Sequence, residues 1–266
     1  VTGVNGQVGY ELVRSLSPLG QVIGLTRAQL DLRDAIAIKN LLNHYQPDII
    51  VNPAAYTAVD KAESEIEAAY AINQHAPAAM AQWAASHEAS LIHYSTDYVF
   101  DGTASTPYLE DAPTNPLNVY GGSKLAGEQA IIASGADALI LRTTWVYGAR
   151  GSNFLRTILR LAKERTELKI VADQIGAPTW SRQLAEATAL IIARQLGIQS
   201  QRGQGLLFGE VAGIYHLSAA GQTSWHGFAQ TIVQHAQQRE ELLALKQDNI
   251  LPIPSSDYPA PAQRPA

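Results

Sequence analysis

The sequence contains no cysteine. This absence excludes a disulfide framework, a thiol nucleophile and a metal site built from thiolates. The chain also lacks any apolar run close to the roughly 18 residues that span a bilayer, and it shows no secretory signal. We therefore predict a cytoplasmic protein that does not enter a membrane.

An excess of positive charge is also missing. The formal net charge is −5, from 19 Lys and Arg against 24 Asp and Glu. This balance offers no electrostatic attraction for nucleic acid or for an anionic membrane surface, although a local basic pocket is compatible with it.

Closely spaced metal ligands are absent as well. The histidines that fail to form such a pattern are His44, His75, His87, His93, His216, His226 and His235. We predict no metal site. What is present is enough apolar sequence, 46% of 266 residues, to bury one large core or a main domain with a smaller lobe.

Three glycines near the start, Gly3, Gly6 and Gly9, stand between a strand end at residues 1–3 and helical spacing at residues 7–16. Glycine allows a tight turn there and lets the backbone approach a pyrophosphate above the helix N-terminus. The alternative is an ordinary glycine-rich loop. Because the glycines follow a strand and precede a helix, we favour a dinucleotide site.

Strand and helix patterns alternate along the chain. Strands are predicted at residues 22–25, 48–51, 91–94, 138–142, 168–171 and 213–217, and helices at residues 7–16, 34–45, 63–86, 120–132, 154–165, 181–196 and 225–245. Repeated βαβ units of this kind indicate an α/β fold with a doubly wound parallel sheet, the Rossmann architecture.

We expect two parts. Residues 1–146 would form the dinucleotide-binding domain, with its first strand truncated. Residues 147–266 would form mainly a smaller C-terminal α/β substrate lobe, with some segments returning to the main sheet. Residues 197–209 read as a polar, glycine-containing loop. Because the chain opens in mid-strand and residues 259–266 end without a cap, we expect it to be a piece of a longer protein.

Three segments follow predicted strands, at residues 54–57, 95–97 and 143–145. Ligands on open parallel sheets bind beyond the carboxyl ends of the strands. These segments and the glycine loop should therefore meet along one crevice.

Tyr120 and Lys124 lie four residues apart on a predicted helix. Such residues share a helix face, so the lysine ammonium would lower the pKa of the phenol and favour its ionised form. A phenol with its pKa lowered from about 10 can act as acid or base near neutral pH. The alternative is a surface tyrosine beside a solvated lysine.

Together these motifs resemble the extended short-chain dehydrogenase/reductase family, and within it the dTDP-4-dehydrorhamnose reductases. The resemblance covers essentially the whole chain and is carried by residues 3–9, 52–63, 93–102, 116–124, 142–147 and 176–179. It implies reduction of a 4-keto deoxysugar nucleotide to dTDP-L-rhamnose, for nucleotide-sugar and cell-surface polysaccharide synthesis. Another 4-keto sugar nucleotide is an open alternative.

The resemblance implies three catalytic residues. Tyr120 protonates the carbonyl oxygen of the sugar, Lys124 keeps the pKa of Tyr120 low and binds the nicotinamide ribose, and the hydroxyl of Thr96 donates to the same oxygen. For Thr96 the alternative is capping of a strand end.

Asp97 and Tyr98 separate two reaction types. Related sugar-nucleotide 4,6-dehydratases carry an Asp-Glu pair after the threonine, because elimination of water needs a second acid/base couple. Tyr98 stands in place of that glutamate, so elimination lacks its base. Asp97 would accept from sugar hydroxyls, with turn capping as the alternative.

The cofactor is predicted to be NADPH or NADH. Thr26 and Arg27 follow residues 22–25, where a cation could receive a 2′-phosphate, and this favours NADPH or acceptance of both. The alternative for Arg27 is a surface arginine. The other cofactor contacts implied are Gly3, Gly6, Gln7, Val8, Gly9, Asp31, Leu32, Ala55, Tyr56, Thr57, Tyr120 and Lys124.

The substrate is predicted to be a dTDP-sugar. Trp145 matches a tryptophan that stacks on the sugar, with core packing as the alternative. Arg264 matches a segment near the diphosphate, where a guanidinium suits phosphate oxygens. Val59 completes the substrate contacts that the resemblance implies.

Magnesium is not carried over from relatives that use it at subunit contacts, because Arg182 stands where a carboxylate would be needed. A homodimer is compatible with the sequence, which does not set the oligomeric state. A non-catalytic regulatory subunit on the same fold, like the beta subunit of methionine adenosyltransferase, stays open as another class. The joint presence of Thr96, Tyr120 and Lys124 argues against it.

Overall fold

A four-stranded parallel sheet forms the centre of the protein in the computed structural model, which describes residues 1–202 and 206–265. Its strands, in spatial order, are β1 (Ile49–Asn52), β2 (Ser90–Thr96), β3 (Asp137–Thr143) and β8 (Gly213–His216). Every neighbouring pair runs parallel. The predicted α/β parallel sheet is confirmed, and all carboxyl ends point to one edge.

The first residues extend this sheet past β1. The N–H of Thr2 donates to the carbonyl of Val51 at 3.1 Å, and Thr2 forms a parallel bridge with Leu25. The prediction of a strand at residues 22–25 is wrong as to extent, because only this bridge forms. Gly3, with a φ of +58°, turns the chain out of extended geometry directly after Thr2, so the pairing does not continue beyond it.

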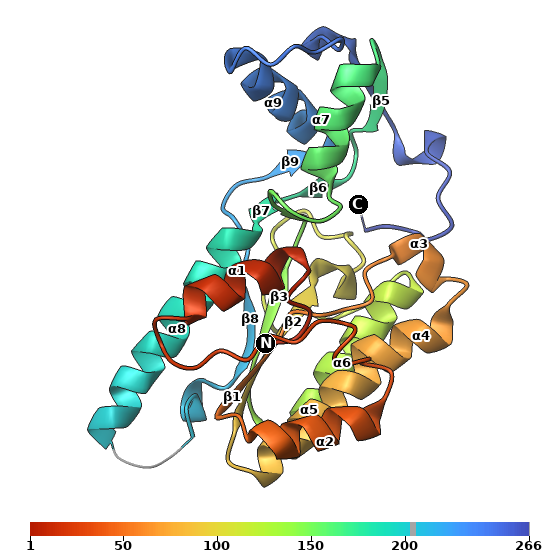
Figure 1. Ribbon diagram of the computed structural model, residues 1–266. Coiled ribbons are helices and arrows are strands. Elements are labelled where there is room, and N and C mark those ends of the chain that lie inside the picture. Colours follow the sequence, from red (N-terminus) through yellow and green to blue (C-terminus); the bar gives the residue numbers. More distant parts are fainter. Residues whose placement is uncertain (203–205, 266) are drawn as a thin grey trace.

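Helices cover both faces of the sheet (Figure 1). On one face, α1 (Gln7–Leu16) packs against α8 (Ser181–Arg202). On the other lie α2 (Ala35–Tyr45), α5 (Ala76–Ser86) and α6 (Val119–Ala133). Each face has its own apolar cluster.

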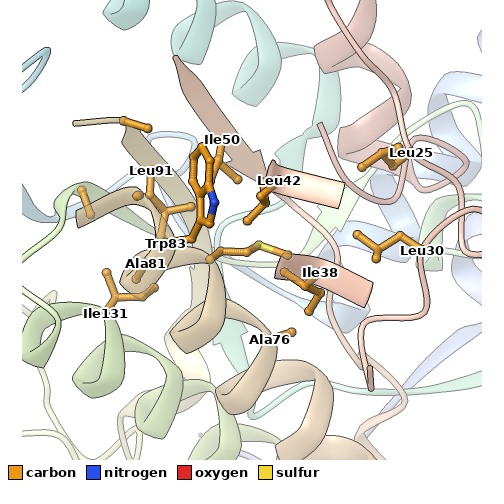
Figure 2. Packing of buried hydrophobic residues seen from close by; sticks show 14 of the residues in the cluster. Leu25, Leu30, Ile38, Leu42, Ile50, Ala76, Ala81, Trp83, Leu91 and Ile131 are labelled. Atoms are coloured by element: carbon orange, nitrogen blue, oxygen red, sulfur yellow. The ribbon is translucent and has the colours of Figure 1, made fainter. Parts of the chain in front are cut away.

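Figure 2 shows the cluster under α2 and α5, where Trp83 lies among Ile50, Leu42 and Leu91. The indole N–H of Trp83 donates to Asn43 Oδ1 at 2.7 Å. Burial of the large indole is therefore achieved without losing its hydrogen bond.

The helix predicted over residues 63–86 is broken. Residues 63–65 separate α3 (Val59–Ala62) from α4 (Ile66–Tyr70), and a π-helical turn η1 (Ala71–His75) lies between α4 and α5. Pro77 has no N–H to donate, so a regular α-helical ladder cannot continue through this point. The prediction missed the break because alanine-rich sequence favours helix throughout.

A second group of elements lies at the top of Figure 1. It contains α7 (Phe154–Glu164), α9 (Trp225–Gln238), and the parallel pair β5 (Leu168–Val171) and β10 (Ile250–Ile253). An apolar cluster of its own holds it together. The predicted division of the chain at residue 146 stays a prediction, and β8 and α8 both lie with the main sheet.

Helix α9 ends at Gln238, so the prediction of a helix to residue 245 is wrong. Glu240 has a φ of 60° and reverses the chain. Leu245 is then fully buried, and its N–H donates to the carbonyl of Ala162 on α7 at 3.0 Å. Leu245 thus belongs to the core of this group of elements rather than to a longer helix, whereas Leu242 is 93% exposed.

Helix α8 continues into the segment predicted as a loop at residues 197–209, of which residues 203–205 lie outside the described residues. The remaining short elements are β4 (Val146–Tyr147), β6 (Ile175–Gly176), β7 (Thr179–Trp180), β9 (Thr223–Ser224), η2 (Asp97–Val99), η3 (Gly209–Val211), η4 (Gln247–Asn249) and η5 (Ser255–Asp257). In the described part of the chain, no helix is both long and apolar enough to cross a membrane.

Candidate active site

A cavity of about 550 Å³ lies at the carboxyl ends of the main strands. It is lined by most of the residues predicted to bind the cofactor: Gly3, Gly6, Gln7, Val8, Gly9, Arg27, Asp31, Leu32, Ala55, Thr57, Tyr120 and Lys124. The fold therefore brings together segments that are far apart in the sequence.

The glycine loop fits a pyrophosphate. Gly3 has a φ of +58°, a conformation that other residues rarely adopt, and a Cβ on Gly9 would lie 2.4 Å from the carbonyl oxygen of Gly3. No side chain caps the N-terminus of α1 at Gly6. Its backbone N–H groups are thus available to an anion.

Two buried hydroxyls also line this cavity, Ser95 Oγ and Thr143 Oγ1. Within the described part of the chain neither has a hydrogen-bond partner. Buried polar groups are normally satisfied, so these two fit a ligand with polar groups. The sequence analysis did not single them out, although both stand at strand ends.

Two predicted cofactor residues do not line the cavity. The hydroxyl of Thr26 donates to Gln29 Oε1 at 2.8 Å, and the hydroxyl of Tyr56 donates to Glu65 at 2.7 Å. The backbone of Tyr56 is held by the side chain of Asn73, which accepts from its N–H at 2.8 Å. Tyr56 therefore shapes the loop that carries Ala55 and Thr57.

The end of the cavity at Asp31 is rich in positive charge. Arg33 donates to both carboxylate oxygens of Asp31, with the shortest contact at 2.6 Å. These bonds, with a smaller contribution from the charge of Arg27, lower the pKa of Asp31 to about 2. The carboxylate is thus paired, and Arg27 lines the cavity beside it.

Thr96 ends β2 and joins a hydrogen-bonded group at the site. Its hydroxyl donates to Asp97 Oδ1 at 3.0 Å and accepts from the N–H of Tyr98 at 3.2 Å. Thr144 donates to the other carboxylate oxygen of Asp97 at 2.5 Å. Both oxygens of Asp97, predicted to bind sugar hydroxyls, are therefore engaged by protein hydroxyls here.

Burial raises the pKa of Tyr120, and hydrogen bonding with Thr96 opposes this shift. The predicted lowering of this pKa by Lys124 is wrong for this structure. The physical reason is that removal of the phenol from water disfavours its ionised form, and the charge of nearby Asp97 acts in the same direction.

Lys124 is 1% exposed and its Nζ contacts groups on β2. It donates to the carbonyl of Tyr94 at 2.6 Å and lies 3.1 Å from His93 Nε2. Burial lowers the pKa of Lys124 to about 8.

Behind Lys124 lies a polar chain that the sequence analysis missed. His93 Nδ1 is 3.1 Å from Asn52 Nδ2, and Asn52 Oδ1 accepts from Thr2 at 2.6 Å. Burial and the charge of Lys124 hold the pKa of His93 well below its usual value. The sequence did offer one indication of this contact, because His93 is the one ionisable residue besides Tyr94 in the strand predicted at residues 91–94.

Tyr98 and Arg264 meet although they are far apart in the chain. Interaction with Arg264 lowers the pKa of Tyr98, but burial, the largest effect, raises it to about 12. Arg264 also forms an ion pair with Asp60 at 2.8 Å. The ring of Tyr98 stands edge-on to that of Tyr120, with centroids 5.4 Å apart.

A second cavity of about 850 Å³ is bounded by Arg264, Gln263, Gln174 and Trp225. Trp145, predicted to stack on the sugar, stacks on Trp225 with ring centroids 3.5 Å apart. Its φ of 44° is unusual for tryptophan. Val59 begins α3, next to Asp60.

Among the described residues, no group of three or more His, Asp or Glu side chains could hold a metal ion. Arg182 is paired with Glu11 at 3.2 Å and lies over the ring of Trp180.

Comparison with known proteins gives consistent results. The family model described as the RmlD substrate binding domain matches residues 1–266. A dTDP-4-dehydrorhamnose reductase of Burkholderia thailandensis is 52% identical over 266 residues, covering 100% of this chain and 87% of the relative.

Two solved structures share the fold over 99% of this chain, and the alignments cover 86% of theirs. Both are dTDP-4-dehydrorhamnose reductases with 35% sequence identity. The protein of Clostridium acetobutylicum gives a TM-score of 0.87, and that of Bacillus anthracis, in complex with NADP, gives 0.83. With sequence and fold matched from end to end, the chain belongs to the family of the RmlD substrate binding domain.

Proposed function

We propose that the chain reduces dTDP-4-dehydro-L-rhamnose (dTDP-4-dehydro-6-deoxy-L-mannose) to dTDP-L-rhamnose with NADPH or NADH. The observation that carries this proposal is the position of Tyr120 and Lys124 on the wall of the cavity that the glycine loop lines. Full-length similarity to dTDP-4-dehydrorhamnose reductases supports the choice of sugar.

The cofactor would lie along the first cavity. Gly3, Gly6 and Gly9 would hold its pyrophosphate at the N-terminus of α1, and Arg27 would face the adenosine end. Ser95 and Thr143 would offer their unpartnered hydroxyls to its polar groups. When bound, the reduced nicotinamide supplies the hydride for C4 of the sugar.

Tyr120 would act as the acid. As negative charge builds on the C4 oxygen, the phenol gives that oxygen its proton. Its raised pKa keeps it protonated at neutral pH, as reduction requires. Lys124, one turn further along α6 and lining the same cavity, would bind the nicotinamide ribose, and the Thr96 hydroxyl would donate to the C4 oxygen.

The dTDP-sugar would extend from Tyr120 towards the second cavity. Arg264, tied to Asp60, lines that cavity and offers a guanidinium to the diphosphate. Tyr98 and Val59 would contact the sugar, and Trp145 would face it from its stack on Trp225. Asp97 would act on the sugar chiefly through Thr96, which it holds.

The two-part division of the chain, a homodimer and a cytoplasmic location stay predictions. Light scattering coupled to size exclusion of the purified chain tests the dimer directly. The reductase is preferred to a non-catalytic subunit because Tyr120 and Lys124 line one cavity and Thr96 hydrogen-bonds with Tyr120.

The test is an assay with enzymatically prepared dTDP-4-dehydro-L-rhamnose and NADPH. Loss of NADPH absorbance should accompany formation of dTDP-L-rhamnose, identified by chromatography and mass. The isomeric 4-keto precursor, dTDP-4-dehydro-6-deoxyglucose, serves as the comparison substrate. Cofactor binding without turnover of either sugar would support the non-catalytic alternative instead.

A further inference from the structure

The charge of Lys124 has no carboxylate partner. Lys124 is almost completely buried, and a buried ammonium is costly unless hydrogen-bonded. Glu128, one turn further along α6, has both oxygens taken by Arg142 at 3.0 and 2.7 Å. Among the described residues, none forms an ion pair with Lys124. What holds the lysine must therefore be neutral.

Two neutral groups on β2 contact its Nζ. The carbonyl of Tyr94 accepts at 2.6 Å, and Nε2 of His93 lies at 3.1 Å. His93 is 0% exposed, so bulk solvent does not reach this nitrogen. The imidazole is the one of the two whose hydrogen-bonding role can change, because either ring nitrogen can carry its proton.

We propose that His93 is a positioning residue for Lys124, and that the tautomer of its ring is coupled to the charge of the lysine through the side-chain amide of Asn52. This inference rests on the role proposed above for Lys124 in the reduction. It adds a residue from β2 to a site otherwise built on Thr96 and α6.

The coupling follows from the contacts. In this structure the amide nitrogen of Asn52 faces His93 Nδ1 at 3.1 Å, while the amide oxygen accepts from Thr2 at 2.6 Å. Nδ1 is then an acceptor, so the ring proton lies on Nε2 and points at Nζ. Lys124 can accept that proton only as the uncharged amine.

The charged lysine requires the opposite arrangement. An ammonium has only donors, so Nε2 must be the acceptor and Nδ1 must carry the ring proton. That N–H needs an acceptor, which Asn52 supplies when its amide is turned to present the oxygen. The orientation of the Asn52 amide is thus coupled to the tautomer of His93 and to the charge of Lys124. Because the pKa of Lys124 is about 8, both the ammonium and the amine are populated within about one pH unit of that value.

Other ionisable groups near α6 do not take over this role. Those on the elements that pack against it are Asp60, Lys61, Glu67, Tyr70, His75, His93, Tyr94, Asp97, Tyr98, Asp137 and Arg142. On α6 itself, Tyr120 and Glu128 are the others. Of all these, Glu128 raises the pKa of Lys124 by its charge, and His93 and Tyr94 contact its Nζ.

Two variants of similar polarity test the contact. His93→Gln can place an amide oxygen near the position of Nε2, whereas His93→Asn is too short to reach Lys124 and keeps only the side facing Asn52. We expect His93→Asn to shift the alkaline limb of the pH profile of kcat/KM to lower pH by about one unit, because loss of an acceptor disfavours the ammonium form of Lys124. His93→Gln should restore most of the limb and of kcat.

The matched control is His87→Asn. His87 lies on the surface, stacked on Trp83 with ring centroids 4.1 Å apart. Its substitution should leave the pH profile of kcat/KM unchanged. Equal losses in both His93 variants with an unmoved limb would mean a merely structural histidine and would overturn the proposal. Wild-type activity is measured alongside, so failure of the reductase assignment is seen separately.

A second measurement needs neither substrate nor a stable variant. The ¹⁵N shifts of His93 in histidine-labelled wild-type protein report its tautomer from about pH 6.5 to about 9.5, on both sides of the lysine midpoint. We expect a neutral ring throughout, with the proton on Nδ1 below the midpoint and on Nε2 above it. A single tautomer of His93 over the whole pH range would contradict the proposed coupling.

Discussion

Thr96 and Asp97 are neighbours in sequence and also hydrogen-bond partners, with the hydroxyl donating to Oδ1 at 3.0 Å. The single proton of that hydroxyl cannot serve Asp97 and a substrate oxygen at once. Burial raises the pKa of Asp97. A protonated Asp97 would donate to Thr96 and free the hydroxyl proton for the substrate.

The first prediction concerns this hydroxyl. Thr96→Val should lower kcat by about 100-fold, since one donor to a developing oxyanion is worth about 3 kcal/mol. Thr96→Ser keeps the hydroxyl and should stay within about tenfold of wild type. Steady-state kinetics with the keto-sugar and NADPH measure both, and a fully active Thr96→Val would remove Thr96 from the chemistry.

The second prediction concerns the acid. Tyr120→Phe should lose at least about 100-fold in kcat, the scale of general acid catalysis. The dissociation constant for NADPH, followed by its fluorescence, should change little because the ring is kept. Near-normal turnover of this variant would show that another group donates the proton.

The third prediction concerns the cofactor. NADPH should serve at least as well as NADH, because Arg33 occupies the carboxylate of Asp31 and Arg27 faces the same cavity end. Arg27→Ala should lower the NADPH to NADH ratio of kcat/KM by about tenfold. Arg14→Ala, on the outer side of α1, is the control. A wild-type preference for NADH above about 100-fold, near 2.7 kcal/mol, would contradict this.

The fourth prediction concerns reaction type. The protein should not dehydrate dTDP-glucose, because Tyr98 replaces the base that elimination needs. Burial raises the pKa of Tyr98 to about 12, so its phenolate is scarce at neutral pH. Incubation with dTDP-glucose and NAD⁺ should yield no 4-keto product at catalytic rates. Its formation would move the chain from reductase to dehydratase.

The fifth prediction concerns stability. The pKa of Lys124 falls from 10.5 to about 8 on folding, which corresponds to a cost of about 3 kcal/mol at neutral pH. Lys124→Met should therefore be more stable than wild type by about 1–3 kcal/mol at pH 7, since a buried charge is replaced by an apolar side chain. The variant should also be inactive, because it lacks the ammonium group proposed to act in the reduction.

The direction in which the stability difference between wild type and Lys124→Met changes with pH follows from the protons bound by the folded and unfolded states. Between about pH 8 and 10.5 the unfolded chain holds the lysine proton and the folded protein does not, so wild-type stability rises relative to Lys124→Met. Denaturant titrations at pH 7 and at about pH 9.5 should show the gap closing. A gap that widens at the higher pH would mean that the lysine is stabilised as a charge when folded.

Local patterns in the chain were enough for part of the site. Glycine spacing predicted the loop at Gly3, because a positive φ and close approach are requirements of the backbone itself. The four-residue spacing of Tyr120 and Lys124 predicted a shared helix face, and position after a strand predicted that Thr96 would lie at the sheet edge.

Patterns of that kind failed where distant parts of the chain compete. Residues 240–245 look helical, but Leu245 packs onto Ala162 across the lobe. The contact of Trp145 with Trp225, eighty residues away in sequence (225 − 145), could not be predicted from local spacing either, and the assignment of Trp145 to the sugar stays a prediction. Periodicity says that a residue is buried but not what lies against it.

By itself, then, the sequence determined the parallel α/β sheet, the glycine cradle and the helix that carries Tyr120 and Lys124, because these depend on spacing along the chain. Tertiary structure alone decided the electrostatics of the site. Burial, which no spacing encodes, raises the pKa of Tyr120 and lowers that of Lys124. Sheet pairing also places His93 and Asn52 on adjacent strands behind the lysine, and this contact exists only once the strands have come together.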